Sequence, residues 1–214
     1  MGTRSKSVLG NIRGKVGHIV LTNWKKVLVV KGLPAQTKKA SDNQQLQRAL
    51  FSSVTKFLGK ATAIYRLGYQ LPKKSSVTQM NLATTYHMAN AVVGQYPDFS
   101  MDLSKIRFTN ALRPTENGWN AKLTRVANSH AEVSWEINPF PEKVTQLDDQ
   151  AVVVIYDSYE NRFFMYKNGV QRRGLSCVID HHTSAGLEIF YWLFFISADG
   201  KFVSETEYLG SVIL

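Results

Sequence analysis

The pattern of apolar and polar positions changes near residue 97 and divides the chain into two regions. Residues 1–97 hold two short apolar runs, followed by stretches in which apolar residues recur every three or four positions, as in amphipathic helices. Residues 98–214 hold short apolar or alternating segments separated by turn residues, as in strands. The pattern therefore predicts an α+β protein. A β-hairpin and two helices occupy 1–97, and an antiparallel β-sandwich occupies 98–214.

The first region opens with a predicted hairpin and a helix. His18–Thr22 and Val27–Val30 are its expected strands, joined by four residues that include two lysines. Ser41 and Gln44 have the spacing of a capping box, in which each side chain bonds the backbone of the other. The apolar stripe that follows, over residues 46–65, predicts one buried helix face.

Glycines and a second capping box predict where the helices of the first region begin and end. Gly59 and Gly68 weaken a helix interior, so they predict a kink or a division into two shorter helices. Ser76 and Gln79 predict the start of another helix, and Gly94 predicts its end. The expected buried stripe of this helix is Leu82, Tyr86, Ala89 and Val93.

The second region is predicted to be built from strands joined by tight turns. Asn-Gly and Asp-Gly pairs mark several of these turns, and Trp135 is the expected core anchor. The predicted strands are Lys105–Thr109, Ala121–Val126, Ala131–Ile137, Ala151–Asp157, Arg162–Lys167, Leu175–Asp180, Glu188–Ser197, Lys201–Thr206 and Tyr208–Leu214. Strand number does not fix strand order, so immunoglobulin-like and jelly-roll sandwiches both remain open.

Charge separates the two regions. Residues 1–97 contain 15 of the 26 basic and one of the 16 acidic residues, a formal charge of +14, whereas residues 98–214 carry −4. Such a split predicts a polyanionic partner for the first region, either nucleic acid bound without sequence preference and sensitive to salt, or an acidic protein. The candidate contact residues are Lys25, Lys26, Lys38, Lys39, Arg48, Lys56, Lys60, Lys73 and Lys74.

The chemistry-bearing residues favour no enzyme class. Cys177, Asp180, His181 and His182 are metal-ligand types, but neighbours in a strand point to opposite faces and no second pair has zinc-site spacing. The chain has no nucleophile elbow and no glycine-rich phosphate loop. We therefore expect no catalytic residues, no metal and no cofactor.

Targeting signals are likewise not found in the sequence. The single cysteine excludes an intramolecular disulfide, no signal peptide is evident, and no apolar run is long enough to span a membrane as a helix. We therefore expect no membrane span, and a location in the cytoplasm or in a virion.

Several short motifs resemble one known family along the full chain. They are Leu9–Gly17, Trp24-Lys25, Leu33-Pro34, Gln44–Arg48 with Phe51, Asn81–Asn90, Tyr96–Phe99, Leu103–Lys105 and Tyr208–Val212. The chain is similar in these to an uncharacterised family from Bacteroidota, a domain of unknown function of about this length. His18 and Leu21-Thr22 depart from its more glycine- and serine-rich pattern. The resemblance implies a source and a shared fold, but it implies no activity, cofactor or catalytic residue.

Two functional hypotheses follow. The first is a non-enzymatic structural protein that self-assembles as a homo-oligomer, in a phage or phage-like particle, with its basic region facing nucleic acid or an acidic neighbour. Its motivation is the segregation of charge together with the segment Phe190–Ile196, which is apolar on both faces and is therefore either a central strand or an interface with another chain. Phe190, Trp192 and Phe194 are the candidate assembly residues. The alternative is a β-sandwich binding module for a protein or carbohydrate ligand, with surface aromatics such as Trp119 contributing.

Overall fold

The structure is a computed structural model that describes residues 13–24, 27–33, 39–127, 129–167, 169–181 and 186–213. Contacts divide the chain into two compact units, residues 1–45 and 46–214. The predicted boundary between residues 97 and 98 falls instead inside the second unit, in the turn between β4 (Val92–Gln95) and β5 (Asp98–Met101). The physical reason is that buried side chains of the helices form one core with the outer face of the larger sheet of the sandwich.

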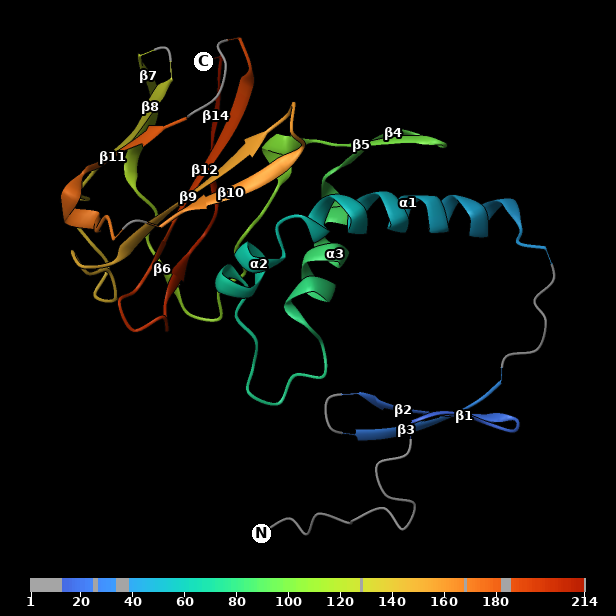
Figure 1. The fold of residues 1–214 in the computed structure, drawn as a ribbon. Helices are drawn as coiled ribbons and strands as arrows, with labels where there is room; N and C mark the ends of the chain where they lie inside the picture. Colours follow the sequence, from blue (N-terminus) through green and yellow to red (C-terminus); the bar gives the residue numbers. More distant parts are fainter. Residues whose placement is uncertain are drawn as a thin grey trace, which may run out of the picture. The chain divides into compact units, whose positions relative to one another are not determined.

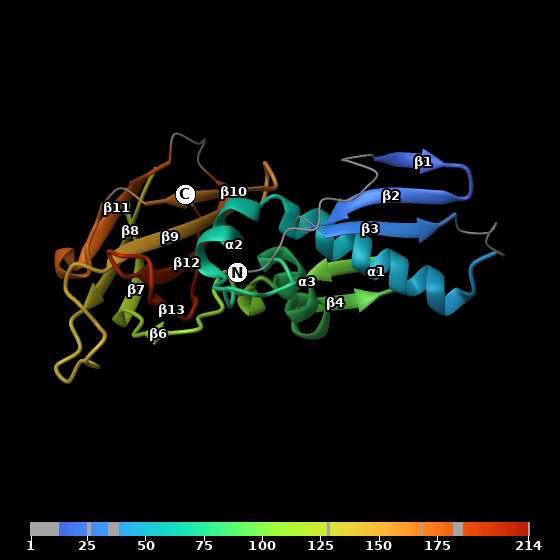
Figure 2. The same ribbon diagram turned by 90° about the horizontal axis from the view of Figure 1, so that it is seen from below.

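The first unit contains a three-stranded antiparallel sheet of order β1–β2–β3 (Figure 2). Strand β2 (Ile19–Trp24) pairs with β3 (Val27–Gly32), and β1 (Gly14–Val16), which the sequence did not predict, pairs with the other edge of β2. Residues 25 and 26, between β2 and β3, lie outside the described residues.

The second unit is built around two sheets that pack face to face (Figure 1). One sheet has the order β11–β8–β7, and the other has the order β10–β9–β12–β13–β6, with β14 also paired to β12. Their bounds are β6 Pro114–Thr115, β7 Trp119–Ala127, β8 His130–Glu136, β9 Gln150–Asp157, β10 Arg162–Tyr166, β11 Ser176–Asp180, β12 Glu188–Ile196, β13 Val203–Ser204 and β14 Glu207–Ile213.

Trp135 lies between these sheets, as predicted. It is buried, its ring contacts that of Phe195 edge-on at a centroid distance of 5.3 Å, and its indole N–H donates to the carbonyl of Arg172 at 2.7 Å. The hydrogen bond satisfies the polar end of the buried side chain, so Trp135 can anchor the core without a desolvation cost.

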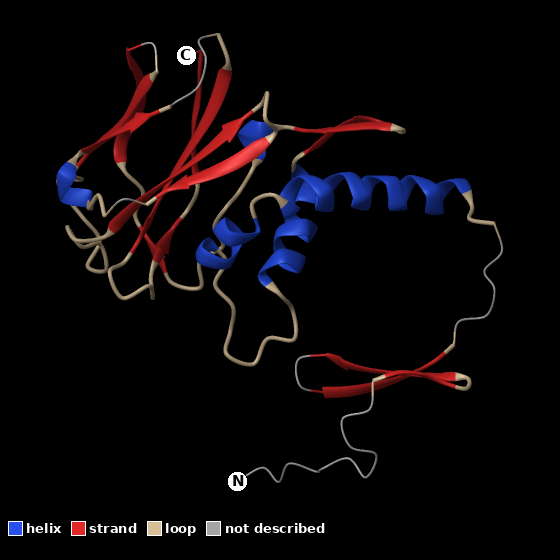
Figure 3. Ribbon diagram, viewed as in Figure 1, coloured by secondary structure: helices blue, strands red, loops and turns tan. Residues whose placement is uncertain are grey.

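Helices cover the outer face of the larger sheet (Figures 1 and 3). They are α1 (Asp42–Gly59), α2 (Thr62–Gly68) and α3 (Gln79–Asn90). Alternate residues of β12 face the two cores: Trp192 and Phe194 join the helix-covered core, and Leu193 joins the core between the sheets. This double burial explains why β12 is apolar on both faces, and it makes β12 a central strand.

The predicted start and division of the first helix are confirmed. The Ser41 N–H donates to Gln44 Oε1 at 3.3 Å, and the Gln44 N–H donates to Ser41 Oγ at 3.4 Å. Helix α1 ends at Gly59, where the stretch divides into two helices, and α2 ends at Gly68.

The predicted register of α3 is wrong. Its N-cap is Thr78, whose side chain accepts from the Asn81 N–H, and not Ser76. The helix ends at Asn90, so Gly94 lies in strand β4. The buried residues are Ala83, Thr84 and His87 instead of the predicted stripe, because the polar His87 and Thr84 face the core.

Eight of the nine predicted strands of the second region are confirmed as β7–β14, and Lys105–Thr109 is the exception. Ile106 and Phe108 are buried, which gives the segment a strand-like alternation. Lys105 is the last residue of the short η1 (Leu103–Lys105). Beyond it, backbone N–H groups donate to side chains: Arg107 to His87 Nε2 at 3.1 Å, and Phe108 to Thr206 Oγ1 at 2.9 Å. Residues 106–109 therefore belong to no sheet.

Replacing Gly68 by alanine is expected to destabilise the second unit by about 1–3 kcal/mol. A Cβ at Gly68 would lie 2.2 Å from the carbonyl oxygen of Phe108, which is backbone and cannot rotate away. Gly59→Ala is the matched control, since a Cβ there meets nothing within 4 Å, and it should be neutral or slightly stabilising. Urea unfolding of both variants measures the difference, and equal stability of the two would contradict the predicted close approach.

None of the helices that the structure describes combines the length and the apolar character needed to cross a membrane.

Candidate ligand pocket

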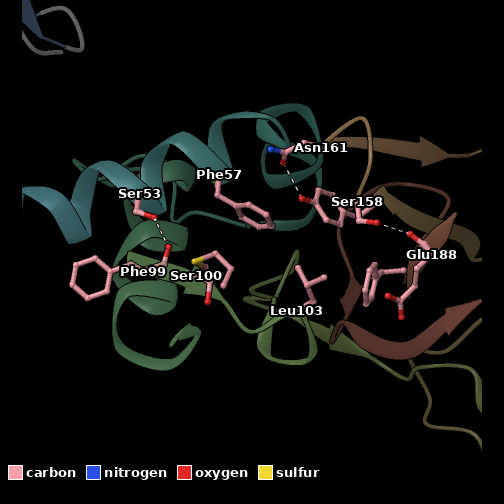
Figure 4. Close-up of a pocket in the computed structure, with 11 residues that line it drawn as sticks. Ser53, Phe57, Phe99, Ser100, Leu103, Ser158, Asn161 and Glu188 are labelled. Carbon is pink, nitrogen blue, oxygen red and sulfur yellow. Dashed lines mark hydrogen bonds between the residues drawn. The ribbon is translucent and has the colours of Figure 1, made fainter. Parts of the chain in front are cut away.

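A pocket of about 400 Å³ lies where α1, strand β5, the β9–β10 turn and the start of β12 meet in the second unit (Figure 4). Four segments far apart in the sequence supply its walls. Its lining is Ser53, Phe57, Phe99, Ser100, Met101, Leu103, Tyr156, Ser158, Asn161, Glu188 and Phe190. Its volume is in the range of small-molecule sites.

Aromatic rings form the apolar part of the pocket. The Phe57 ring projects from α1 toward the sandwich strands (Figure 4) and meets Tyr156 edge-on at a centroid distance of 5.5 Å. Phe163, behind them, lies 4.6 Å from the Tyr156 ring and 5.3 Å from the Phe57 ring. Because these rings brace one another, the apolar wall is preformed.

Hydroxyl, amide and carboxylate groups form the polar part. The Tyr156 hydroxyl donates to Asn161 Oδ1 at 2.8 Å, and burial raises the pKa of this phenol, with the nearby Asp157 adding to the effect. Ser158 Oγ donates to the carbonyl of Glu188 at 2.8 Å, and Ser211 Oγ donates to Glu188 Oε1 at 2.7 Å. These bonds orient the Glu188 carboxylate and the Asn161 amide at the rim of the pocket.

The lining combines aromatic rings with a small set of hydrogen-bonding groups. Among the described residues that line the pocket, Glu188 is the only carboxylate, and serine, asparagine and tyrosine side chains supply the other polar groups. Small-molecule sites commonly have an apolar wall with a few placed polar groups that orient the ligand. The pocket can therefore hold a ligand that has an apolar face and several hydrogen-bonding groups.

A second pocket, of about 500 Å³, lies between the edge strands β10 and β11. Its charged groups already serve the fold. Asp157 Oδ1 accepts from the N–H groups of Tyr159 and Glu160 at 2.8 and 3.0 Å, and Asp180 Oδ1 lies 3.6 Å from His130 Nε2. We therefore take the first pocket as the candidate site.

The predicted basic contact residues fall on separate surfaces. Arg48 and Lys56 are exposed on α1, and Lys60 is exposed directly after the end of that helix; partial burial and the neighbouring Lys56 lower the pKa of Lys60. Lys73 and Lys74 are exposed in the loop between α2 and α3, which extends away from α1 (Figure 1). The structure thus shows no single basic patch among these five residues. Lys39 is exposed in the first unit, and Lys25, Lys26 and Lys38 lie outside the described residues.

The predicted assembly residues are placed differently. Trp192 and Phe194 have 0% exposure and pack within their own chain, so they offer no surface to a neighbouring copy, and this part of the prediction is corrected. Phe190 is half-buried and lines the pocket. Trp119, proposed as a surface aromatic, is exposed at the start of β7.

The metal-ligand residue types near Cys177 do not come together, because successive residues of a strand point to opposite faces. Cys177 faces the core between the sheets, where burial raises the pKa of its thiol to about 11, whereas Asp180 is exposed. His181 is buried with Nε2 2.6 Å from the Tyr191 hydroxyl, and His182 lies outside the described residues. Within the described ranges, no three His, Cys, Asp or Glu side chains are grouped so as to hold a metal.

Sequence reasoning missed the pocket because no motif joins its residues. Ser53, Ser158, Asn161 and Glu188 are ordinary surface residues taken singly. The one available signal was Phe57, which lies on the predicted stripe of α1 and was assigned to the core alone. Only the packing of α1 on the sheet brings it beside the β9–β10 turn.

Comparisons with known proteins identify a family and some distant structural likenesses. A model of a protein family of unknown function matches residues 11–210. Among curated proteins, none matches the chain.

The similar solved structures include an FN3 domain of human collagen XX, 20% identical with a TM-score of 0.37, covering 50% of this chain and 98% of that one. The fn3 domain of human contactin 1 is 10% identical with a TM-score of 0.37, covering 47% and 77%. Domains d3–d4 of the rat CD45 extracellular region are 10% identical with a TM-score of 0.36, covering 94% and 97%.

Proposed function

The chain belongs to DUF6266, a family of unknown function, and we propose from its pocket that it is a non-enzymatic β-sandwich module that binds carbohydrate. The observation that carries the proposal is the pairing of braced aromatic rings with an amide and a carboxylate in one pocket of about 400 Å³. A sugar ring has an apolar C–H face and a rim of hydroxyls, so it matches such a lining. A pocket of this size holds one or two sugar units better than it holds a protein surface.

The polar groups of the pocket have the chemistry that sugar hydroxyls need. Glu188 is an acceptor, Asn161 offers both donors and acceptors, and serine hydroxyls serve as either. A hydrogen bond to a charged group is worth about 1.5–3 kcal/mol, so Glu188 is expected to give the strongest single contact. The lone carboxylate also supports the non-enzymatic part of the proposal, because it has no partner in the lining for proton transfer.

The strand order supports the immunoglobulin-like alternative for the sandwich. The chain changes sheet after β8, after β10 and after β11, so that β7, β8 and β11 form one sheet and β9, β10, β12 and β14 lie in the other. This alternation is that of immunoglobulin-like sandwiches. The comparisons give no support to a role in a phage particle or to a Bacteroidota source.

Replacing Glu188 by glutamine, or Phe57 by leucine, is expected to weaken carbohydrate binding about 10-fold each. Glutamine preserves the acceptor for Ser211 but removes the charge, and leucine preserves apolar volume but removes the ring face. Isothermal titration with a panel of neutral hexasaccharides (β-glucan, β-xylan and α-mannan) measures the dissociation constants.

Glu160→Gln and Phe51→Leu are the matched controls for this titration. Glu160 is an exposed carboxylate near the same turn, and Phe51 is 53% exposed on the same helix, yet neither lines the pocket. Both should bind as the wild type does. Wild-type protein that binds no member of the panel would reject a carbohydrate ligand, and equal losses in the controls would place the binding elsewhere.

A further inference from the structure

The N-terminal sheet β1–β3 has very little core of its own. Among its residues whose side chains the structure describes, Leu21 alone is buried, at 5% exposure. Val16, Ile19 and Val30 are 52%, 40% and 57% exposed. Contiguous exposed apolar surface of this kind marks an interaction site, so this sheet is a candidate interface.

The exposed apolar residues all lie on one face of the sheet. Residues directly opposite each other on paired strands share a face, and successive residues alternate. The pairs Val16 with Ile19 and Leu21 with Val30 therefore put these four side chains together, and Leu28 joins them through its pairing with Asn23. The same face carries no charged residue among those described.

The lysines lie on the opposite face. Val20 is paired with Lys15 on one side and with Lys31 on the other, so the two lysines flank it there. The first unit has nine basic residues and one acidic residue, and two copies would repel if their charges met. The segregation of Lys15 and Lys31 to the back allows two apolar faces to meet without that repulsion.

The sheet surfaces of the second unit that the structure describes are covered or mixed in character. One broad face of its larger sheet is covered by helices, and the other forms the core between the sheets. The outer face of β7–β8–β11 has Lys122, Thr124, Glu132 and Ser134 in register, beside Val178, which is opposite Glu132 and 49% exposed. The two-stranded sheet β4–β5 exposes Val93, and Tyr96 in its turn, next to the exposed Asp98. A second copy of the N-terminal sheet, in contrast, presents an apolar face that carries no charged residue among those described.

We propose that the apolar face of β1–β3 is a homodimer interface that packs against the same face of a second copy. The two sheets then form a small sandwich about a two-fold axis, the self-complementary arrangement of symmetric dimers. Lys15 and Lys31 lie on its outer surfaces. The dimer is independent of the carbohydrate pocket, which lies wholly in the second unit.

Light scattering of the full chain during size exclusion over the micromolar range tests this interface. For the wild type, light scattering should give a mass in the eluting peak of twice the 24.1 kDa of the chain. Val30→Glu places a charge in the apolar interface and should raise the dimer dissociation constant on the order of 100-fold or more. Val29→Glu adds the same charge to the neighbouring residue of β3, on the opposite face, and should leave the dimer intact. A monomeric wild type, or equal loss with both variants, would overturn the proposal.

Alkylation of introduced cysteines distinguishes a second copy from coverage by the same chain and does not depend on Val30→Glu folding. Cys177 is the only native cysteine and is buried, so a cysteine at position 30 or 29 can be followed selectively. For Val30→Cys, the alkylation rate should fall as protein concentration rises, whereas for Val29→Cys it should not change. A rate at position 30 that is slow at every concentration would mean that the same chain covers the face. A rate that is fast throughout would mean that nothing does. Either result would overturn the proposal.

Discussion

Replacement of Arg172 by methionine is expected to lower the free energy of unfolding by about 3–5 kcal/mol. Arg172 lies in η2 (Arg172–Gly174), and its Nη2 is 3.4 Å from Asp149 Oδ2. The two side chains are almost fully buried, at 4% and 0% exposure. Removing the cation would leave a buried carboxylate without its ion-pair partner, which is why the expected loss is large.

The guanidinium also joins segments distant in sequence. Its Nη1 donates to the carbonyl of Asn117 at 2.8 Å, its Nη2 donates to the carbonyl of Glu116 at 2.7 Å, and its plane lies over the Phe195 ring at 4.0 Å. Methionine would retain apolar packing on the ring but none of these hydrogen bonds. The turn before β7 would lose its attachment to β12, so part of the loss should appear as increased hydrogen exchange in that turn.

Urea unfolding followed by tryptophan fluorescence measures the effect. Arg173→Met is the matched control, since Arg173 is the exposed neighbour in the same turn, and it should change stability by less than about 0.5 kcal/mol. Combining Arg172→Met with Asp149→Asn should cost less than the sum of the single changes, because the second change removes the unpaired charge. A loss below about 1 kcal/mol for Arg172→Met alone would show that the ion pair contributes little.

Acidification from pH 7 to pH 4 is expected to remove about 3 kcal/mol of stability through His87 alone. The pKa of His87 is lowered to about 4, chiefly because burial disfavours the imidazolium, while its bond to Ala83 acts in the opposite direction. The unfolded chain keeps an ordinary histidine pKa near 6.5, so it binds more protons than the folded protein between these values. Stability is thus fully present above about pH 6.5 and is lost as the pH falls toward 4.

The geometry of His87 explains why the neutral ring is required. Its Nδ1 lies 2.6 Å from the carbonyl oxygen of Ala83, to which it donates, and its Nε2 accepts from the Arg107 N–H at 3.1 Å. A proton on Nε2 would replace this acceptor with a second donor facing the same N–H. Protonation therefore breaks the link between α3 and the segment that carries Ile106 and Phe108.

A comparison of the wild type with His87→Gln, in urea at several pH values, isolates this contribution. Burial also lowers the pKa of His181, so the wild-type pH dependence contains both histidines. The difference in stability between wild type and His87→Gln should shrink as the pH falls from 6.5 to 4. A constant difference between wild type and His87→Gln would mean that His87 does not titrate differently in the two states.

Local patterns in the sequence predicted the elements, but not how those elements share their cores. The alternation of β8 and the capping box at Ser41 act within a few residues, and both were found. The burial of Trp192 and Phe194 depends on which element covers the second face of β12, and a strand pattern is the same whether that element is a helix of the same chain or a neighbouring copy. The predicted buried face of α3 was wrong because His87 is polar and yet buried. Its Nε2 accepts from the Arg107 N–H, a partner that only the tertiary structure brings to it.

The pocket was beyond sequence reasoning for the same reason. Its hydrogen bonds join residues up to tens of positions apart, such as Ser158 with Glu188, and Ser53 with the carbonyl of Phe99. Periodicity carries no information about such pairs. The apolar face of β1–β3 is different: its residues could have been grouped from the sequence, had the register of β1 on β2 been known.

The claim that this pocket binds carbohydrate is tested most directly by mapping a bound hexasaccharide with backbone amide chemical shifts of the isotopically labelled full chain. We predict that saturating ligand shifts the amides of Ser53, Phe57, Ser158, Asn161 and Glu188 and leaves those of β11 and β1–β3 unchanged. Shifts confined to the β10–β11 edge, or no shifts with any member of the panel, would contradict the assignment.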